Sequence, residues 1–102
     1  MPKQLTIAID FDDTFTSDPA TWSDVIEVLQ HAGHRVVCVS ARRDCIEHRQ
    51  ELMVALPNGV AVLLSYDTPK REFARRHGVN VDIWIDDMPE AIPTREEVLR
   101  MA

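Results

Sequence analysis

The feature that most constrains the fold is an alternation of short β-branched runs with segments of helical period. The runs cover residues 5–9, 35–39, 60–64 and 81–85. Such runs are typical of buried strands, and strands separated by helices predict βαβ units with parallel strands and right-handed crossovers. No linker or repeat interrupts the pattern, so we predict a single α/β domain over residues 1-102, a three-layer α/β/α sandwich with a parallel Rossmann-like sheet.

Apolar residues at helical spacing indicate the helices that cover this sheet. The first helix carries Trp22, Val25, Ile26, Leu29 and Ala32 on one face, and the second carries Ile46, Leu52, Met53 and Leu56.

Turn-forming and capping residues predict where the helices begin and end. Thr21 or Ser23 can cap the first helix, and Gly33 follows its end. Asp67 or Thr68 can cap a third helix, with Pro69 in its first turn and Gly78 at its end. A last helix is expected near Thr94, after Pro93.

Composition excludes several classes of protein. Eleven Lys plus Arg against seventeen Asp plus Glu give a formal charge of −6, which argues against an extended nucleic-acid groove. No run approaches the roughly 20 apolar residues of a membrane span, and the residues before Asp10 lack a signal-peptide pattern. Cys38 and Cys45 lack the spacing of a zinc site, so we expect buried thiols and a cytoplasmic location.

Polar residues follow the predicted strands at their carboxyl ends, which lie along one edge of a parallel sheet, where ligands bind. Asp10 and Asp12 follow the first strand, Ser40 ends the second, Lys70 comes after the third, and Asp86 and Asp87 end the fourth. A single carboxylate after a strand commonly bends a turn or caps a helix. Several at one rim are costly unless a cation binds there, so the pattern predicts a metal site.

These residues resemble the four motifs of the haloacid dehalogenase superfamily. The DxDxT motif after an apolar strand matches residues 10–14, the Ser motif matches Ser40, the Lys motif matches Lys70, and the acidic pair matches residues 86–87. The match spans residues 5 to 92. It implies the strand order 3-2-1-4.

The resemblance also implies an activity, that of a phosphatase acting on a phosphate monoester. Asp10 would attack phosphorus to form an aspartyl phosphate, and Asp12 would act as general acid and then general base. Ser40 and Lys70 would stabilise charge on the phosphoryl oxygens as catalytic and substrate-binding residues. The backbone N–H of Phe11 would also bind the phosphate.

Magnesium is the cofactor that the resemblance implies. Its ligands would be Asp10, the backbone carbonyl of Asp12, and Asp86, with Asp87 holding metal-bound water or orienting Lys70. Arg42 and Arg43 stand just beyond Ser40, where their guanidinium groups could bind a second phosphate or a carboxylate of the substrate.

The sequence departs from the family in two respects. Asp13 stands where the family often has glycine. Asp10 to Ser40 and Ser40 to Lys70 leave no room for an inserted cap domain, so the site would be open. An open site suits a phosphorylated macromolecule or the end of a nucleotide or oligonucleotide, or else a neighbouring subunit that covers the site.

Other functions remain open at this stage. A regulatory module with the same fold could bind metal and phosphate without turnover, and a phosphotransferase could pass the phosphoryl group to an alcohol. A phosphorelay receiver domain has similar residues in a different order, because its phosphorylated Asp follows the third strand, where this chain has Ser65, Tyr66 and Asp67.

Overall fold

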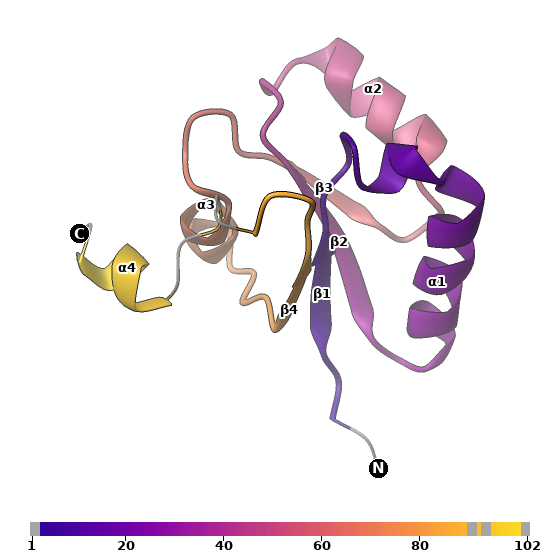
Figure 1. Ribbon diagram of the computed structural model, residues 1–102, viewed down its shortest axis with the longest axis horizontal. Coiled ribbons are helices and arrows are strands. Elements are labelled where there is room, and N and C mark those ends of the chain that lie inside the picture. The colour runs from indigo at the N-terminus through magenta and orange to yellow at the C-terminus, as the bar shows by residue number, and fades with distance from the viewer. Residues whose placement is uncertain (1–2, 90–91, 93–94, 101–102) are drawn as a thin grey trace.

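The protein forms a four-stranded, all-parallel sheet with helices packed on it (Figure 1), and the computed structural model describes residues 3–89, 92 and 95–100. The strands are β1 (Thr6–Ile9), β2 (Arg35–Ser40), β3 (Ala61–Leu64) and β4 (Ile83–Ile85). They lie in the order β3-β2-β1-β4. The four strands, their parallel pairing and their order are therefore as predicted.

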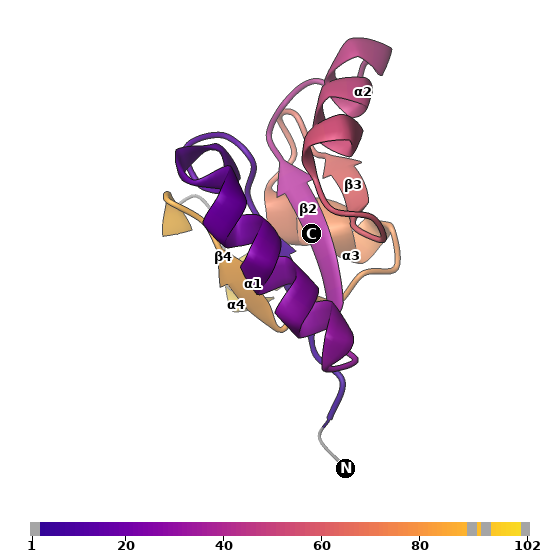
Figure 2. The same cartoon turned by 90° about the vertical axis from the view of Figure 1, so that its right-hand side faces the viewer.

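Alternate residues of the strands contribute to two separate hydrophobic clusters, because successive strand side chains point to opposite faces. Ile9 and Cys38 belong to a cluster that includes Ile26 and Leu52 of the helices α1 (Pro19–His31) and α2 (Ile46–Ala55). Val37 belongs to the second cluster, which includes Ala74 of α3 (Lys70–Arg76), whose helix lies across the sheet from α1 and α2 (Figures 1 and 2).

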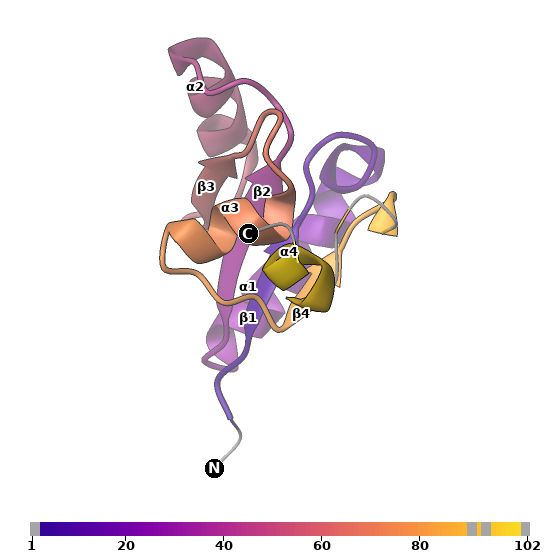
Figure 3. The same ribbon diagram turned by 90° about the vertical axis from the view of Figure 1, so that its left-hand side faces the viewer.

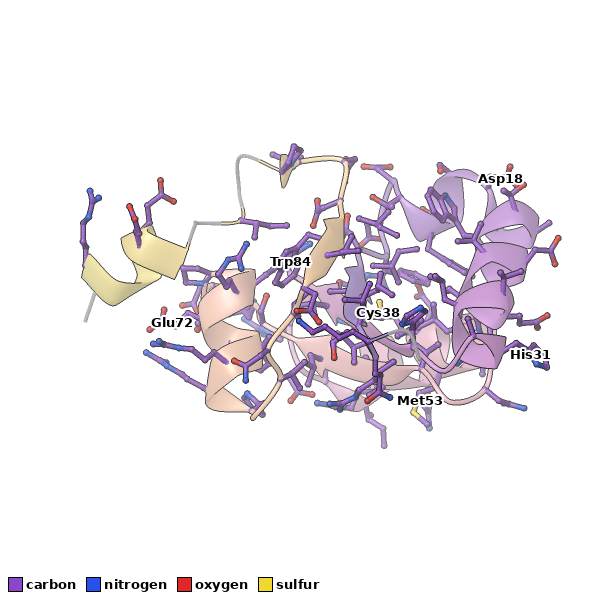
Figure 4. All side chains as sticks on the ribbon, turned by 90° about the horizontal axis from the view of Figure 1, so that it is seen from below. Asp18, His31, Cys38, Met53, Glu72 and Trp84 are labelled. Atoms are coloured by element: carbon purple, nitrogen blue, oxygen red, sulfur yellow. The ribbon has the colours of Figure 1, made fainter. Side chains whose placement is uncertain are left out.

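The cysteines are free thiols, and they differ in burial. Cys38 is fully buried in the sheet (Figure 4), and burial raises the pKa of its thiol to about 12. Cys45 is half-buried at the start of α2. The expectation of a buried thiol is confirmed for Cys38 alone.

The predicted caps of α1 were wrong. The helix begins at Pro19, and the Asp18 carboxylate accepts a hydrogen bond from the backbone N–H of Thr21 at 3.3 Å. Pro19 has no N–H to satisfy and its ring presets the helical φ, which favours a start earlier than Thr21 or Ser23. Gly33 follows the helix with φ +90°, as predicted.

The other helices also differ in detail from the predictions. Ile46 and Met53 of α2 are exposed, Met53 at the outside of the molecule (Figure 4). α3 has no side-chain cap, and Pro69 precedes it instead of lying in its first turn.

The C-terminal helix α4 covers Arg95–Arg100. Its expected start at Pro93 and Thr94 lies outside the described residues. Within the part of the chain that the structure describes, no helix is long and apolar enough to cross a membrane.

Candidate active site

The carboxyl ends of β1 and β4 place two aspartates side by side. Ile9 pairs with Ile85 in the parallel register, so Asp10 and Asp86 follow paired residues. The backbone N–H of Asp10 extends this pairing by donating to the Ile85 carbonyl at 2.9 Å. Residues 7–9 of β1 and all of β4 are apolar, and a carboxylate follows each strand directly, so burying the strands brings both carboxylates to one rim.

Lys70 lies between these two carboxylates. Its Nζ donates to Asp10 Oδ1 at 2.8 Å and to Asp86 Oδ2 at 2.6 Å. The side chains are largely buried, with exposures of 11% for Lys70, 9% for Asp10 and 4% for Asp86. Burial lowers the pKa of Lys70, but the hydrogen bonds and charges of the two carboxylates outweigh burial and raise it. Lys70 is therefore held as an ammonium.

Thr14 joins Asp10 to a third carboxylate, that of Asp87. The Thr14 hydroxyl lies 3.2 Å from Asp10 Oδ2 and 3.2 Å from Asp87 Oδ1, and its oxygen accepts from the Asp87 N–H at 3.1 Å. A hydroxyl has one proton to donate, so it can satisfy only one of the two carboxylates at a time. Thr14 thus ties the loop after β1 to the loop after β4.

The three aspartates carry more negative charge than Lys70 can neutralise. Oxygens of Asp10, Asp86 and Asp87 lie within 4.8 Å of one another. Burial raises the pKa of Asp10 despite Lys70, and the neighbouring Asp87 and Asp86 raise it further. The hydrogen bond with Asp10 correspondingly lowers the pKa of Asp87. When two carboxyl groups lie close together, ionisation of only one of them is favoured unless a cation is present.

This donor set fits magnesium. Mg²⁺ is a hard cation that prefers carboxylate and water oxygens and is commonly bound by one or two carboxylates. Asp10, Asp86 and Asp87 offer only oxygen donors, without a His or Cys that would favour zinc. The Asp12 side chain, by contrast, is not part of this group of three.

Asp12 is held by a neighbouring arginine. Arg42 Nε and Nη2 donate to its two carboxylate oxygens at 2.9 and 2.8 Å, and Arg42 Nη1 lies 2.7 Å from Glu51 Oε2 on α2. The hydrogen bonds from Arg42 lower the pKa of Asp12. The same guanidinium lies over the Phe11 ring, 5.2 Å from its centroid.

Two of the predicted binding residues are buried. Ser40 is 1% exposed, and its Oγ accepts a hydrogen bond from the Arg42 N–H at 3.2 Å. The Phe11 ring is 3% exposed and stacks on Phe15 with centroids 5.7 Å apart.

A pocket of about 340 Å³ opens at this edge of the sheet. It is lined by Asp10, Asp12, Asp13, Ala41, Arg42, Lys70, Asp86, Asp87 and Met88. Most of the predicted site residues therefore meet at one hollow. Ser40 and Phe11 are buried and are not part of its lining.

Sequence reasoning assigned no role to Thr14 or Glu51. Thr14 belongs to the quoted DxDxT motif, which was a signal for it, whereas Glu51 lies on a helix and nothing in its spacing points to Arg42.

Asp13 has φ +62°, a left-handed conformation that glycine adopts readily and that Asp tolerates better than most residues. Asp13 therefore suits this turn.

Comparisons with protein-family models, with curated proteins and with solved structures find no match for this chain. A functional interpretation therefore depends on the chemistry of the residues at the pocket.

Proposed function

We propose that this chain is a magnesium-dependent phosphatase of the haloacid dehalogenase type, which hydrolyses a phosphate monoester with Asp10 as nucleophile. One observation carries the proposal: Lys70 lies between Asp10 and Asp86 at the rim of a pocket, with Asp87 beside them. A buried nucleophile next to an ammonium and a cation-binding carboxylate set is what phosphoryl transfer requires.

The reaction divides into two displacements. An Asp10 oxygen attacks phosphorus and the bond to the leaving oxygen breaks, while Asp12 donates a proton to that oxygen. Water then attacks the aspartyl phosphate, Asp12 takes its proton, and the P–O bond to Asp10 breaks, which releases phosphate. Lys70 would neutralise charge on the phosphoryl oxygens throughout.

Magnesium, when held by Asp10, Asp86 and Asp87, would supply further neutralisation of the phosphoryl oxygens. Thr14 would orient two of these carboxylates, as hydrogen bonds around metal ligands commonly do. Ser40 is buried and does not line the pocket, so its proposed role is to fix the loop that carries Arg42, through the hydrogen bond from the Arg42 N–H.

The acid role of Asp12 requires it to leave Arg42. In the bidentate pair Asp12 is an ionised acceptor with a lowered pKa, and it has no proton to donate. A substrate with a second anionic group would give Arg42 another partner and release Asp12. A substrate that carries an anion beyond the reacting phosphate would therefore free Asp12, and a substrate without one requires the Asp12–Arg42 pair to open by itself.

Turnover of an aryl phosphate with Mg²⁺ tests the proposal. Asp10→Asn should abolish phosphate release, and Asp24→Asn on the exposed side of α1 should not change it. Mass spectrometry of the wild-type protein during turnover should show a phosphoryl adduct on Asp10. A folded protein that binds Mg²⁺ but hydrolyses none of a broad panel of phosphate esters would overturn the proposal.

A module that binds metal and phosphate without turnover is the second candidate. The ion pair between Asp12 and Arg42, which Glu51 also binds, favours this candidate because the acid-base residue is already engaged. Phosphate release that stops in Asp10→Asn would exclude it. Adding alcohols to the assay would detect phosphotransfer as a new phosphate ester.

The proposal extends to the finer architecture. We propose a capless three-layer sandwich, since the described chain between Asp10 and Lys70 consists of the helices and strands of the sheet domain. We also propose a cytoplasmic location, which the free thiols of Cys38 and Cys45 favour. The strand order β3-β2-β1-β4 also differs from the 2-1-3-4-5 order of flavodoxin-like receiver domains.

A further inference from the structure

An exposed aromatic ring and a guanidinium lie together after β2 and β3. The Arg43 Cζ lies over the Tyr66 ring, 5.3 Å from its centroid. Tyr66 is 52% exposed and Arg43 is also exposed. These two side chains, which we call the stacking pair, are planar groups that offer their faces to an aromatic ligand.

The guanidinium of Arg43 is accessible to an anionic or aromatic ligand. Within the described ranges, it has no carboxylate within ion-pair distance, whereas its neighbours are paired: Arg42 binds Asp12, and Arg49 binds Asp44. The adjacent Asp44 is thus already occupied by Arg49 through two hydrogen bonds of 2.7 and 3.0 Å. An anion or an electron-rich ring can approach Arg43 without displacing an ion pair.

The backbone at Tyr66 is strained. Its φ is +53°, a left-handed conformation that is uncommon for a bulky side chain and that glycine or asparagine adopts more easily. Strain of this kind persists where the surrounding structure holds it, and it concentrates at ligand sites. The preceding residue helps to fix this conformation, because Ser65 is buried and its N–H donates to the Ser40 carbonyl at 2.8 Å.

Arg43 is the chain neighbour of a pocket residue, and Tyr66 lies against Arg43. Arg43 follows Arg42, which lines the pocket, and Tyr66 follows Ser65, which is bonded to Ser40. The segments after β2 and β3 lie side by side at the carboxyl edge of the sheet (Figures 1 and 3). A ligand whose phosphate reaches Asp10 can therefore extend over the stacking pair.

We propose that the leaving group of the substrate is a nucleoside whose base stacks on Tyr66 and Arg43. This inference rests on the proposed phosphatase function and names its substrate class. The base supplies the planar aromatic group that the stacking pair fits. The formal net charge of −6 disfavours binding along an extended nucleic acid, so the proposed substrate is one nucleotide or a phosphorylated nucleic-acid end.

The test compares substrates that differ only in the base. Adenosine 5′-monophosphate and ribose 5-phosphate share the sugar phosphate, as do adenosine 3′-monophosphate and ribose 3-phosphate. We expect kcat/KM to be about 5- to 150-fold higher for at least one nucleotide than for its base-free partner, the range of one base stacked on an aromatic side chain. Equal values for both pairs would overturn the proposal.

Variants of Tyr66 locate the effect. Tyr66→Asn removes the ring at a position whose backbone asparagine tolerates, so the fold should persist, and the preference for the nucleotide over its base-free partner should disappear. Tyr66→Phe keeps the ring face and should keep the preference. A preference that survives Tyr66→Asn would place the base elsewhere and refute the assignment.

Binding separates this inference from the phosphatase proposal. Calorimetric titration of Asp10→Asn with adenosine 5′-monophosphate or 3′-monophosphate should show binding that Tyr66→Asn weakens by the same factor. Binding that depends on Tyr66 without turnover in the wild type would uphold the stacking pair and refute the phosphatase. Turnover without a base preference would uphold the phosphatase proposal and refute the stacking pair.

Discussion

Lys70→Met should strongly destabilise the metal-free protein. Lys70 is the only positive side chain that bonds Asp10 and Asp86 in the described structure, through two contacts of 2.8 and 2.6 Å. Methionine preserves most of the length of the side chain, so the change removes the charge and the hydrogen bonds but leaves much of the packing. Two carboxylates would then face each other with little access to water.

The burial of the three side chains sets the size of the effect. All are at most 11% exposed, so the value for a buried pair applies, and removing one partner costs about 3–5 kcal/mol. An exposed pair would contribute only about 0–1 kcal/mol. For a chain of this size, such a loss lowers Tm by at least about 12 °C.

Urea denaturation in EDTA, followed by circular dichroism, measures the loss directly. Lys3→Met is the matched control, because Lys3 is the only other lysine of the chain and is exposed. The double variant Lys70→Met with Asp86→Asn should lose less stability than Lys70→Met, since it removes one of the two facing charges. Adding Mg²⁺ should restore part of the stability of Lys70→Met.

A loss below about 1 kcal/mol for Lys70→Met, equal to that of an exposed pair, would refute this reasoning. So would a double variant that is less stable than Lys70→Met, because the facing carboxylates would then not be the source of the loss.

Three further predictions follow from other contacts. Thr14→Val removes the hydroxyl that bridges two carboxylates and should weaken Mg²⁺ binding about 10- to 100-fold by calorimetry, while Thr14→Ser should keep it; equal affinities would contradict the bridge. Leu52→Ala in the fully buried core should cost about 2–5 kcal/mol in urea, against at most about 0.5 kcal/mol for the exposed Val54→Ala. The hydrogen bonds from Thr21 lower the pKa of Asp18 below its ordinary 3.8, so its stabilisation is present above that pH and is lost as the pH falls through the lowered value. Thermal melts of Asp18→Asn, which caps without titrating, should therefore lose less stability than wild type between pH 5 and pH 3; parallel losses would exclude the cap as the cause.

The strands and their parallel pairing could be predicted because the relevant signals are local, whereas their order was predicted from the resemblance to a known family. A β-branched run must be buried, and burying four such runs separated by helices leaves few arrangements other than a parallel sheet. Caps were less predictable. Thr21 and Ser23 are good capping residues, but Pro19 favours a helix that begins earlier, with Asp18 as its cap. Where several capping residues stand close together, small energy differences decide which of them caps the helix.

The candidate site was predictable as a set of residues but not as a set of contacts. The strand ends alone indicated that Asp10, Lys70 and Asp86 would meet, since each follows an apolar strand or opens the helix after one. The partner of Arg42 was not predictable. Glu51 and Asp12 are on different elements, and a long side chain can reach several acids until the elements are docked.

The sequence by itself determined the parallel sheet and the edge at which the acidic residues collect, because alternation and burial act on neighbouring residues. Only the tertiary structure decided how the charges pair: Lys70 with Asp10 and Asp86, and Arg42 with Asp12. It also placed Tyr66 beside Arg43. Such pairings depend on ångström-scale distances between separate loops, and no local pattern encodes them.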